Sequence, residues 1–179
     1  MRRTITGLLA TLLLVGPTQA QMAAQGGEHS AQTCPADPVA PPPALAGWVG
    51  RVAVSAAGRP DAIDTATILP GRGADVALLS VPDVTYPVRP SHPGGTVSYG
   101  GLLGFTVTQA GTYRVGIGSG AWLEMVRDGQ ALLSTAHSPG PACTGLRKMV
   151  DFALTPGAYL LEISGNGSPT LPLLVTRLP

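Results

Sequence analysis

FTVTQAGTYRVGI at residues 105–117 and FALTPGAYLLEI at residues 152–163 decide the fold, because they are two copies of one pattern. In each copy an alternating apolar segment is followed by a turn glycine and by a second alternating segment that begins near a tyrosine. Side chains of a strand alternate between its faces, so each copy has one apolar face. Two such hairpins expose too much apolar surface to be stable separately. We therefore expect them to pack as opposing sheets of one β-sandwich.

The remaining C-terminal half continues the strand pattern. Besides the first hairpin at 102–108 and 112–117, we expect strands at 74–79, 121–127, 131–135, 148–154, 158–164 and 171–177. The pair Asp128-Gly129 is a strong signal for a tight hairpin turn. About eight strands with regular turn spacing predict an all-β fold, a single jelly-roll or Greek-key β-sandwich.

The N-terminus has the pattern of a secretory signal peptide. Arg2 and Arg3 precede an apolar run at 8–15 and then small residues, which predicts that residues 1–20 are removed by cleavage before Gln21. The apolar run is too short to span a bilayer, and we expect no transmembrane segment elsewhere. The mature protein is therefore expected to be periplasmic or secreted.

A proline-rich stretch separates the signal peptide from the sandwich. Consecutive prolines favour the polyproline II conformation and remove hydrogen-bond donors, so residues 21–46 are expected to form a disordered linker. Residues 47–179 are then expected to form the β-sandwich domain. A mature chain of about 160 residues suits one hydrophobic core better than two.

Composition and charge exclude some classes of protein. The chain has 24 glycines and 18 prolines, and only 12% of its residues are charged, which favours an all-β domain over a helical one. The net charge is +1, and removal of the signal peptide takes away two arginines. A nearly neutral mature chain argues against binding to nucleic acid.

Cys34 and Cys143 are the only cysteines. In an oxidising compartment two cysteines most simply form one disulfide. This bond would close a loop of roughly 110 residues and stabilise the fold by about 4 kcal/mol. It would tie the N-terminal segment to the loop before Arg147, a structural role without catalysis. Two separate thiols are the alternative.

Three histidines limit the possible metal chemistry. A non-haem iron site needs two histidines and a carboxylate on one side of the metal. His92 and His137 are the candidates, with Glu124 or Asp151 as the carboxylate, because His29 falls in the expected linker. No His-x-His spacing supports the site, so we expect these histidines to serve loops, with no cofactor. Iron belongs only to an alternative, enzymatic interpretation.

An exposed aromatic residue is the best candidate for contact with a ligand. In the expected strand at 121–127, Trp122 shares a face with Glu124, while apolar residues occupy the other face. We therefore name Trp122 and Glu124, together with His137 from a nearby loop, as candidate ligand-binding residues. No residue is assigned a catalytic role, because no Gly-x-Ser-x-Gly motif is present.

The run at 104–163 resembles bacterial pre-peptidase C-terminal-like domains. It contains Phe-x-Val, Ala-Gly-x-Tyr, Asp-Gly and Pro-Gly-x-Tyr-x-Leu in the order that those domains show. They are extracellular β-sandwiches, usually attached to secreted enzymes, and many carry an Asp-x-Asp-Leu strand that is sometimes near calcium. The matching residues at 121–124 include one carboxylate, so the resemblance does not extend to a calcium site.

A second resemblance involves the blocks at 118–122, 136–137, 140–141 and 147–152 together with Cys143. In these blocks the chain is similar to small exported proteins of alphaproteobacteria that often bear the name homogentisate 1,2-dioxygenase. The name implies an iron-dependent dioxygenase that would use the two candidate histidines. The motifs of the much longer cupin dioxygenase are not matched here.

We therefore expect an exported, non-catalytic β-sandwich module with a binding, accessory or stabilising role and a protein or small molecule as its partner. An iron dioxygenase and a purely structural envelope protein are the two alternatives. Bound iron that is lost with His137 would favour the enzyme. The absence of any partner or ligand would favour the structural protein.

Overall fold

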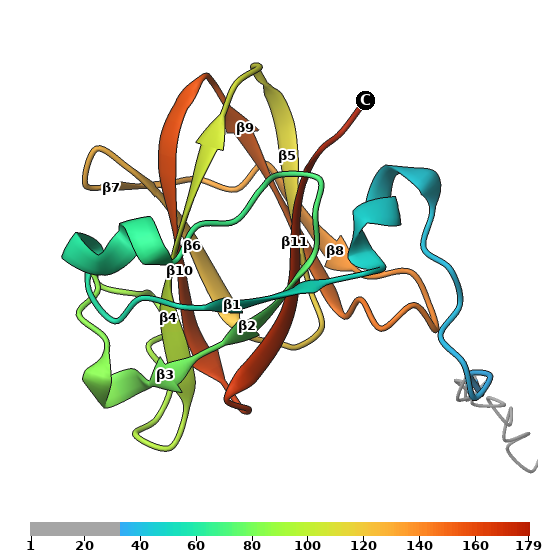
Figure 1. Ribbon diagram of the computed structural model, residues 1–179, viewed down its shortest axis with the longest axis horizontal. Coiled ribbons are helices and arrows are strands. Elements are labelled where there is room, and N and C mark those ends of the chain that lie inside the picture. The colour runs from blue at the N-terminus through green and yellow to red at the C-terminus, as the bar shows by residue number, and fades with distance from the viewer. Residues whose placement is uncertain (1–32) are drawn as a thin grey trace, which may run out of the picture. The chain divides into compact units, whose positions relative to one another are not determined.

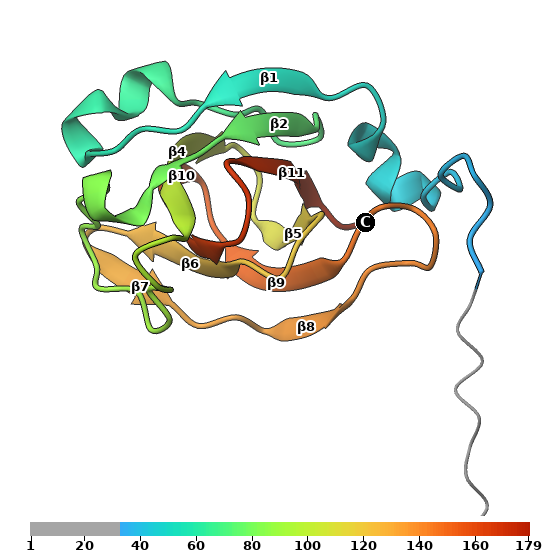
Figure 2. The same cartoon turned by 90° about the horizontal axis from the view of Figure 1, so that it is seen from below.

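Two β-sheets stack face to face in this computed structural model, which describes residues 33–179 (Figure 1 and Figure 2). The strand order of the six-stranded sheet is β1 (Val52–Ser55), β2 (Ala74–Ala77), β11 (Thr170–Arg177), β5 (Gly111–Ile117), β9 (Lys148–Leu154) and β8 (Ala136–Pro139). That of the five-stranded sheet is β3 (Leu79–Ser80), β4 (Tyr99–Val107), β10 (Gly157–Asn166), β6 (Trp122–Arg127) and β7 (Gln130–Leu132). The predicted all-β sandwich is confirmed, with eleven strands in the described residues where the sequence indicated about eight.

The described residues contain three short 3₁₀ helices: η1 (Pro43–Trp48) precedes β1, and η2 (Pro60–Thr65) and η3 (Val81–Asp83) lie between the following strands. Each has a proline in its first turn, where the missing N–H costs nothing. The expected signal peptide and His29 lie outside the described residues. Within residues 33–179, no helix has the length and apolar character that a bilayer span requires.

The two copies of the repeated motif do not form the two hairpins that their pattern predicted. In each copy the chain passes from one sheet to the other, so β4 and β5 lie in different sheets, as do β9 and β10. Each strand pairs instead with a strand of the other copy. Phe105 lies opposite Tyr159 in one sheet, and Phe152 lies opposite Tyr113 in the other. This reciprocal register relates the two copies, and with them the two sheets, by a pseudo-twofold axis.

The relation extends to the strands that follow each copy, because β6 lies beside β10 and β11 lies beside β5. Each crossover ends at a glycine with positive φ, 157° at Gly111 and 148° at Gly157. A Cβ atom would lie 2.8 Å from Arg177 Nε at Gly111 and 3.0 Å from Arg127 Nη2 at Gly157. Each of these guanidinium groups donates to the carbonyl of the residue before the glycine. Glycine is therefore required at both positions.

Apolar side chains from both sheets fill the space between them. The fully buried members with the largest side chains are Phe152, Leu103, Ile117, Met125, Leu154, Leu161, Ile163, Leu171 and Leu173. The alternation that predicted one apolar face for each repeat copy is thus confirmed. The Asp128-Gly129 hairpin is confirmed as well, because it joins β6 to β7 with Arg127 opposite Gln130.

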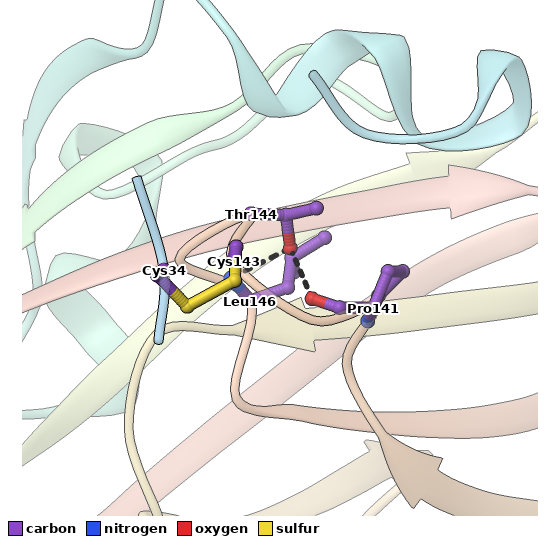
Figure 3. The surroundings of a disulfide bond; sticks show 5 residues. All are labelled: Cys34, Pro141, Cys143, Thr144 and Leu146. Carbon is purple, nitrogen blue, oxygen red and sulfur yellow. Dashed lines mark hydrogen bonds between the residues drawn. A yellow bond between two sulfur atoms is a disulfide. The ribbon is translucent and has the colours of Figure 1, made fainter. Parts of the chain in front are cut away.

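The predicted disulfide joins Cys34 to Cys143, with Cα atoms 5.3 Å apart and a sequence separation of 109 (Figure 3). Two further contacts hold the same region. The Val39 N–H donates to the carbonyl of Cys143, and Trp48 Nε1 donates to the carbonyl of Thr144 at 2.9 Å. The N-terminal segment is therefore anchored to the loop between β8 and β9 by covalent and non-covalent contacts.

The end of the expected linker at 21–46 is part of the folded domain. Leu45 in η1 is buried and packs with Trp48, Leu146, Met149 and Leu174 in a second apolar cluster outside the six-stranded sheet. Residues 33–46, the described part of this stretch, contain no strand. The proline pattern did not predict that Leu45 and Trp48, which follow the prolines, would be buried against the domain.

Candidate functional site

A segment of fifteen residues, 84–98, connects η3 to β4 and crosses the outer face of the five-stranded sheet; we call it the strap (Figure 2). Pro87, Pro90 and Pro93 occur in it at intervals of three, and each lacks a backbone N–H. The strap therefore does not pair with the sheet as a strand. Two of its remaining amides, those of Val88 and Ser91, donate instead to side chains of the sheet.

Two glutamates accept these hydrogen bonds. Glu162 on β10 and Glu124 on β6 lie directly opposite each other, so their side chains share the outer face. The Val88 N–H donates to Glu162 Oε1 at 3.0 Å. Ser91 donates to Glu124 Oε1 through its N–H at 3.2 Å and its hydroxyl at 2.6 Å. Two acidic side chains thus hold the middle of the strap.

Two hydroxyl groups and a ring contact complete the attachment of the strap. The Tyr86 hydroxyl donates to the carbonyl of Ile163 at 2.8 Å, and the Ser164 hydroxyl donates to the carbonyl of His92 at 2.9 Å. The imidazole of His92 packs on Trp122, with 3.9 Å between ring centroids. Apart from the Thr85 N–H, which donates to the carbonyl of Gly58, these contacts come from β6 or β10, so the strap covers these two strands.

Trp122 is half-buried and surrounded by the protein's own groups. Its ring lies 3.9 Å from the His92 ring and 4.8 Å from Lys148 Nζ, and its Nε1 donates to Glu124 Oε1 at 2.8 Å. Lys148 Nζ also donates to the carbonyl of Ala121, and burial lowers the pKa of this lysine. The predicted shared face of Trp122 and Glu124 is correct, but in this conformation the indole stabilises the strap rather than presenting an open platform.

Glu162 is the most perturbed acid at this site. It is 1% exposed, and its Oε2 atom has no hydrogen-bond partner. Burial raises its pKa to about 7, the hydrogen bond from Val88 opposes the rise, and the charge of Glu124 adds to it. Burial and the charge of Glu162 likewise raise the pKa of Tyr86 to about 12.

Glu124 responds in the opposite direction. Partial burial acts to raise its pKa, but the hydrogen bonds from Ser91 and Trp122 outweigh burial and lower it. Two facing carboxyl groups with pKa values shifted apart are a known arrangement for acid–base chemistry. Here the strap seals Glu162 from solvent, so no substrate reaches the pair in this conformation.

An open groove of about 1010 Å³ continues the same outer face beyond the strap. Its floor is formed by residues of β4, β6 and β10: Gly104, Thr106, Val126, Ala158 and Leu160. Ile63 and its neighbours from η2 form one wall, and the turn at 127–129 forms the other. Pro87 of the strap also lines the groove, which therefore ends where the strap begins.

The structure brings together three of the five residues that the sequence singled out, whereas Asp151 is bonded to Arg114 in the other sheet. Trp122 and Glu124 of β6 share a hydrogen bond, and His92 of the strap packs on Trp122. His137 lies apart from them on β8, an exposed edge strand of the other sheet. Among residues 33–179, no three His, Cys, Asp or Glu residues are grouped so that they could hold a metal ion.

Glu162 and Tyr86 were missed by the sequence analysis. The alternation in β10 places Glu162 on the outer face, where a glutamate is normally in water. Its burial depends on a segment that begins more than sixty positions earlier in the chain. The prolines of the strap disfavour pairing as a strand, but nothing in their spacing indicates which surface that segment covers.

No model of a known protein family matches the chain, and no similar sequence is found among curated proteins. The resemblances to pre-peptidase C-terminal-like domains and to the dioxygenase-named exported proteins stay predictions. What the protein does is therefore inferred from its own geometry.

Proposed function

We propose that the protein is an exported, non-catalytic binding module that holds a ligand in the groove on its five-stranded sheet. The observation that carries the proposal is the groove itself, a large concavity with an apolar floor that no side chain of the described residues fills. The polar groups beside it are engaged with one another under the strap. This distribution suits binding better than catalysis.

The lining of the groove indicates the shape of its ligand. Ala158 leaves the floor low and Leu160 gives it an apolar surface. Ile63 closes one side by packing over Gly104, where a Cβ atom would lie 3.0 Å from Ile63 Cγ1. A flat or extended apolar group would bury most of its surface there. Such a group could belong to a small molecule or to a segment of a partner protein.

A fluorescent probe of apolar clefts, anilinonaphthalene sulfonate, tests the groove directly. Ala158→Trp places a bulky side chain on the groove floor and should weaken binding of the probe by at least about tenfold. Ala153→Trp is the matched control. Ala153 is also exposed, and its pair with Thr112 in the opposite sheet is equivalent to the pair of Thr106 with Ala158.

Equal binding by the two variants would show that the probe does not use the groove and would overturn the proposal. A native protein that binds neither the probe nor any member of an apolar ligand set would favour the purely structural role. Circular dichroism of both variants checks that the sandwich is intact.

A further inference from the structure

We propose that Glu162 is a proton-operated latch for the strap: the strap stays on the sheet while this carboxyl group is neutral, and it lifts when the group ionises. Lifting would extend the groove over the part of β6 and β10 that the strap covers. This inference rests on the proposed function of the groove, whose access it would regulate.

The geometry of the buried carboxyl group supports the latch. Glu162 is almost completely buried, one of its oxygens has no partner, and a second carboxylate, Glu124, lies directly opposite. A neutral acid tolerates such a place, while an ionised one lacks both solvent and a counter-charge. Lifting the strap would admit water, because the Val88 amide of the strap is bonded to this carboxyl group and Tyr86 of the strap lies near it.

The charged and titratable groups around Glu162 offer no counter-charge in contact with it. Glu124 faces it from β6, Tyr86 and His92 reach the area from the strap, and β4 presents Leu102 at the paired position. Lys148 of β9 contacts the ring of Trp122 and the carbonyl of Ala121. Arg89, also in the strap, is exposed.

The pseudo-twofold axis provides an internal comparison. The pair Glu162 and Glu124 corresponds to Gly116 and Leu174, which are opposite each other in the six-stranded sheet. There the cover is apolar: Leu174 packs with η1 residues, and a Cβ at Gly116 would touch Leu146. The fold therefore does not need carboxylates at this position. One face has a permanent cover next to a disulfide, and the other has a cover that two acids hold.

The direction of the pH dependence follows from the shift. A solvated Glu162 would have a pKa near 4.5, and the covered group has a pKa of about 7. The closed strap is therefore fully favoured below about pH 4.5, and it becomes less favoured as the pH rises to about 7. Over this interval the ratio of closed to open strap falls by up to about 300-fold.

Hydrogen exchange of the Ser91 amide, followed by NMR in the full mature protein, measures this ratio. Its acceptor is Glu124, whose pKa is lowered, so that acceptor stays ionised across the interval. After correction for the intrinsic exchange rate, protection of Ser91 should fall by up to about 300-fold between about pH 4.5 and about pH 7.5. Protection of the Val115 amide in the core reports global stability and is the internal control.

Glu162→Gln keeps the acceptor for Val88 and should hold the protection of Ser91 at its low-pH level throughout. Glu124→Gln should move the midpoint to lower pH, which tests the latch even if Glu162→Gln does not fold. His92→Gln should leave the transition in place. A transition that persists in Glu162→Gln, or that disappears with His92→Gln alone, would overturn the latch.

The same variants separate the latch from the groove. In the wild type, anilinonaphthalene sulfonate should bind more tightly at about pH 8 than at about pH 5, and Glu162→Gln should abolish the difference. A pH-dependent Ser91 amide in a protein that does not bind the probe would refute the groove and keep the latch. Probe binding with no transition at Ser91 would refute the latch and keep the groove.

Discussion

The two tyrosines of the repeat make unequal contacts, and this inequality can be measured. Tyr113 donates one hydrogen bond, to the carbonyl of Gln109 at 2.9 Å. Tyr159 donates to the carbonyl of Thr155 at 2.8 Å, accepts the Thr155 N–H at 3.0 Å, and accepts Arg127 Nη1 at 2.8 Å. Both hydroxyls bond to the residue four positions earlier, so Tyr113→Phe is a matched control for Tyr159→Phe.

A net hydrogen bond stabilises a protein by about 1 kcal/mol, and one to a charged group by somewhat more. Tyr113→Phe should therefore lower the free energy of unfolding by about 1 kcal/mol. Tyr159→Phe removes three bonds, but Thr155 and part of Arg127 are exposed and regain water, so the expected loss is about 2–3 kcal/mol.

Equilibrium unfolding in urea measures both losses, provided that the dependence on denaturant stays the same in each variant. The double variant should show additive losses, because the two hydroxyls share no partner. If Tyr113→Phe is as costly as Tyr159→Phe, the hydrogen-bond inventory does not explain how the corners stabilise the sandwich, and the reasoning fails.

Two further variants test the disulfide and the strap. Replacing Cys34 and Cys143 together with serine should lower the free energy of unfolding by up to about 4–5 kcal/mol, because the bond spans 109 positions. Urea denaturation measures the loss, with the oxidised wild type as the reference. A loss under about 1 kcal/mol would mean that the non-covalent contacts alone anchor the N-terminal segment. Ser91→Ala removes the hydroxyl that donates to Glu124 and should raise the pKa of that carboxyl group, as followed by carbon NMR titration of its side chain. An unchanged titration would show that Ser91 does not tune Glu124.

The sequence predicted most strands of this fold, but it did not predict which strands pair with each other. Period-two alternation located the long strands and the buried face of each repeat copy correctly. It could not distinguish a strand that pairs with its own neighbour from one that pairs with the equivalent strand of the other copy, because both have the same pattern. Strand β8 was missed since it is short, polar and contains Pro139, features that an edge position tolerates.

The same period-two alternation predicted part of the candidate site. Trp122 and Glu124 were placed together because residues two apart in a strand share a face. His92 joins them through the path of the strap, and His137 does not, although the sequence treats the two histidines alike. The burial of Glu162 is a tertiary effect, which no local pattern predicts.

The pseudo-twofold axis also shows what occupies the position equivalent to the groove floor in the six-stranded sheet. Its floor residues Leu160 and Gly104 are paired in the five-stranded sheet, and the corresponding pair in the six-stranded sheet is Arg114 and Asp151. There two hydrogen bonds of 2.7 Å join the guanidinium to the carboxylate and fill the equivalent surface. Because both sheets have the same strand pairing at this point, the fold accepts either arrangement. The low, apolar floor therefore comes from the residues at these positions and is not imposed by the architecture. Such a residue-specific floor is expected of a surface that binds a ligand.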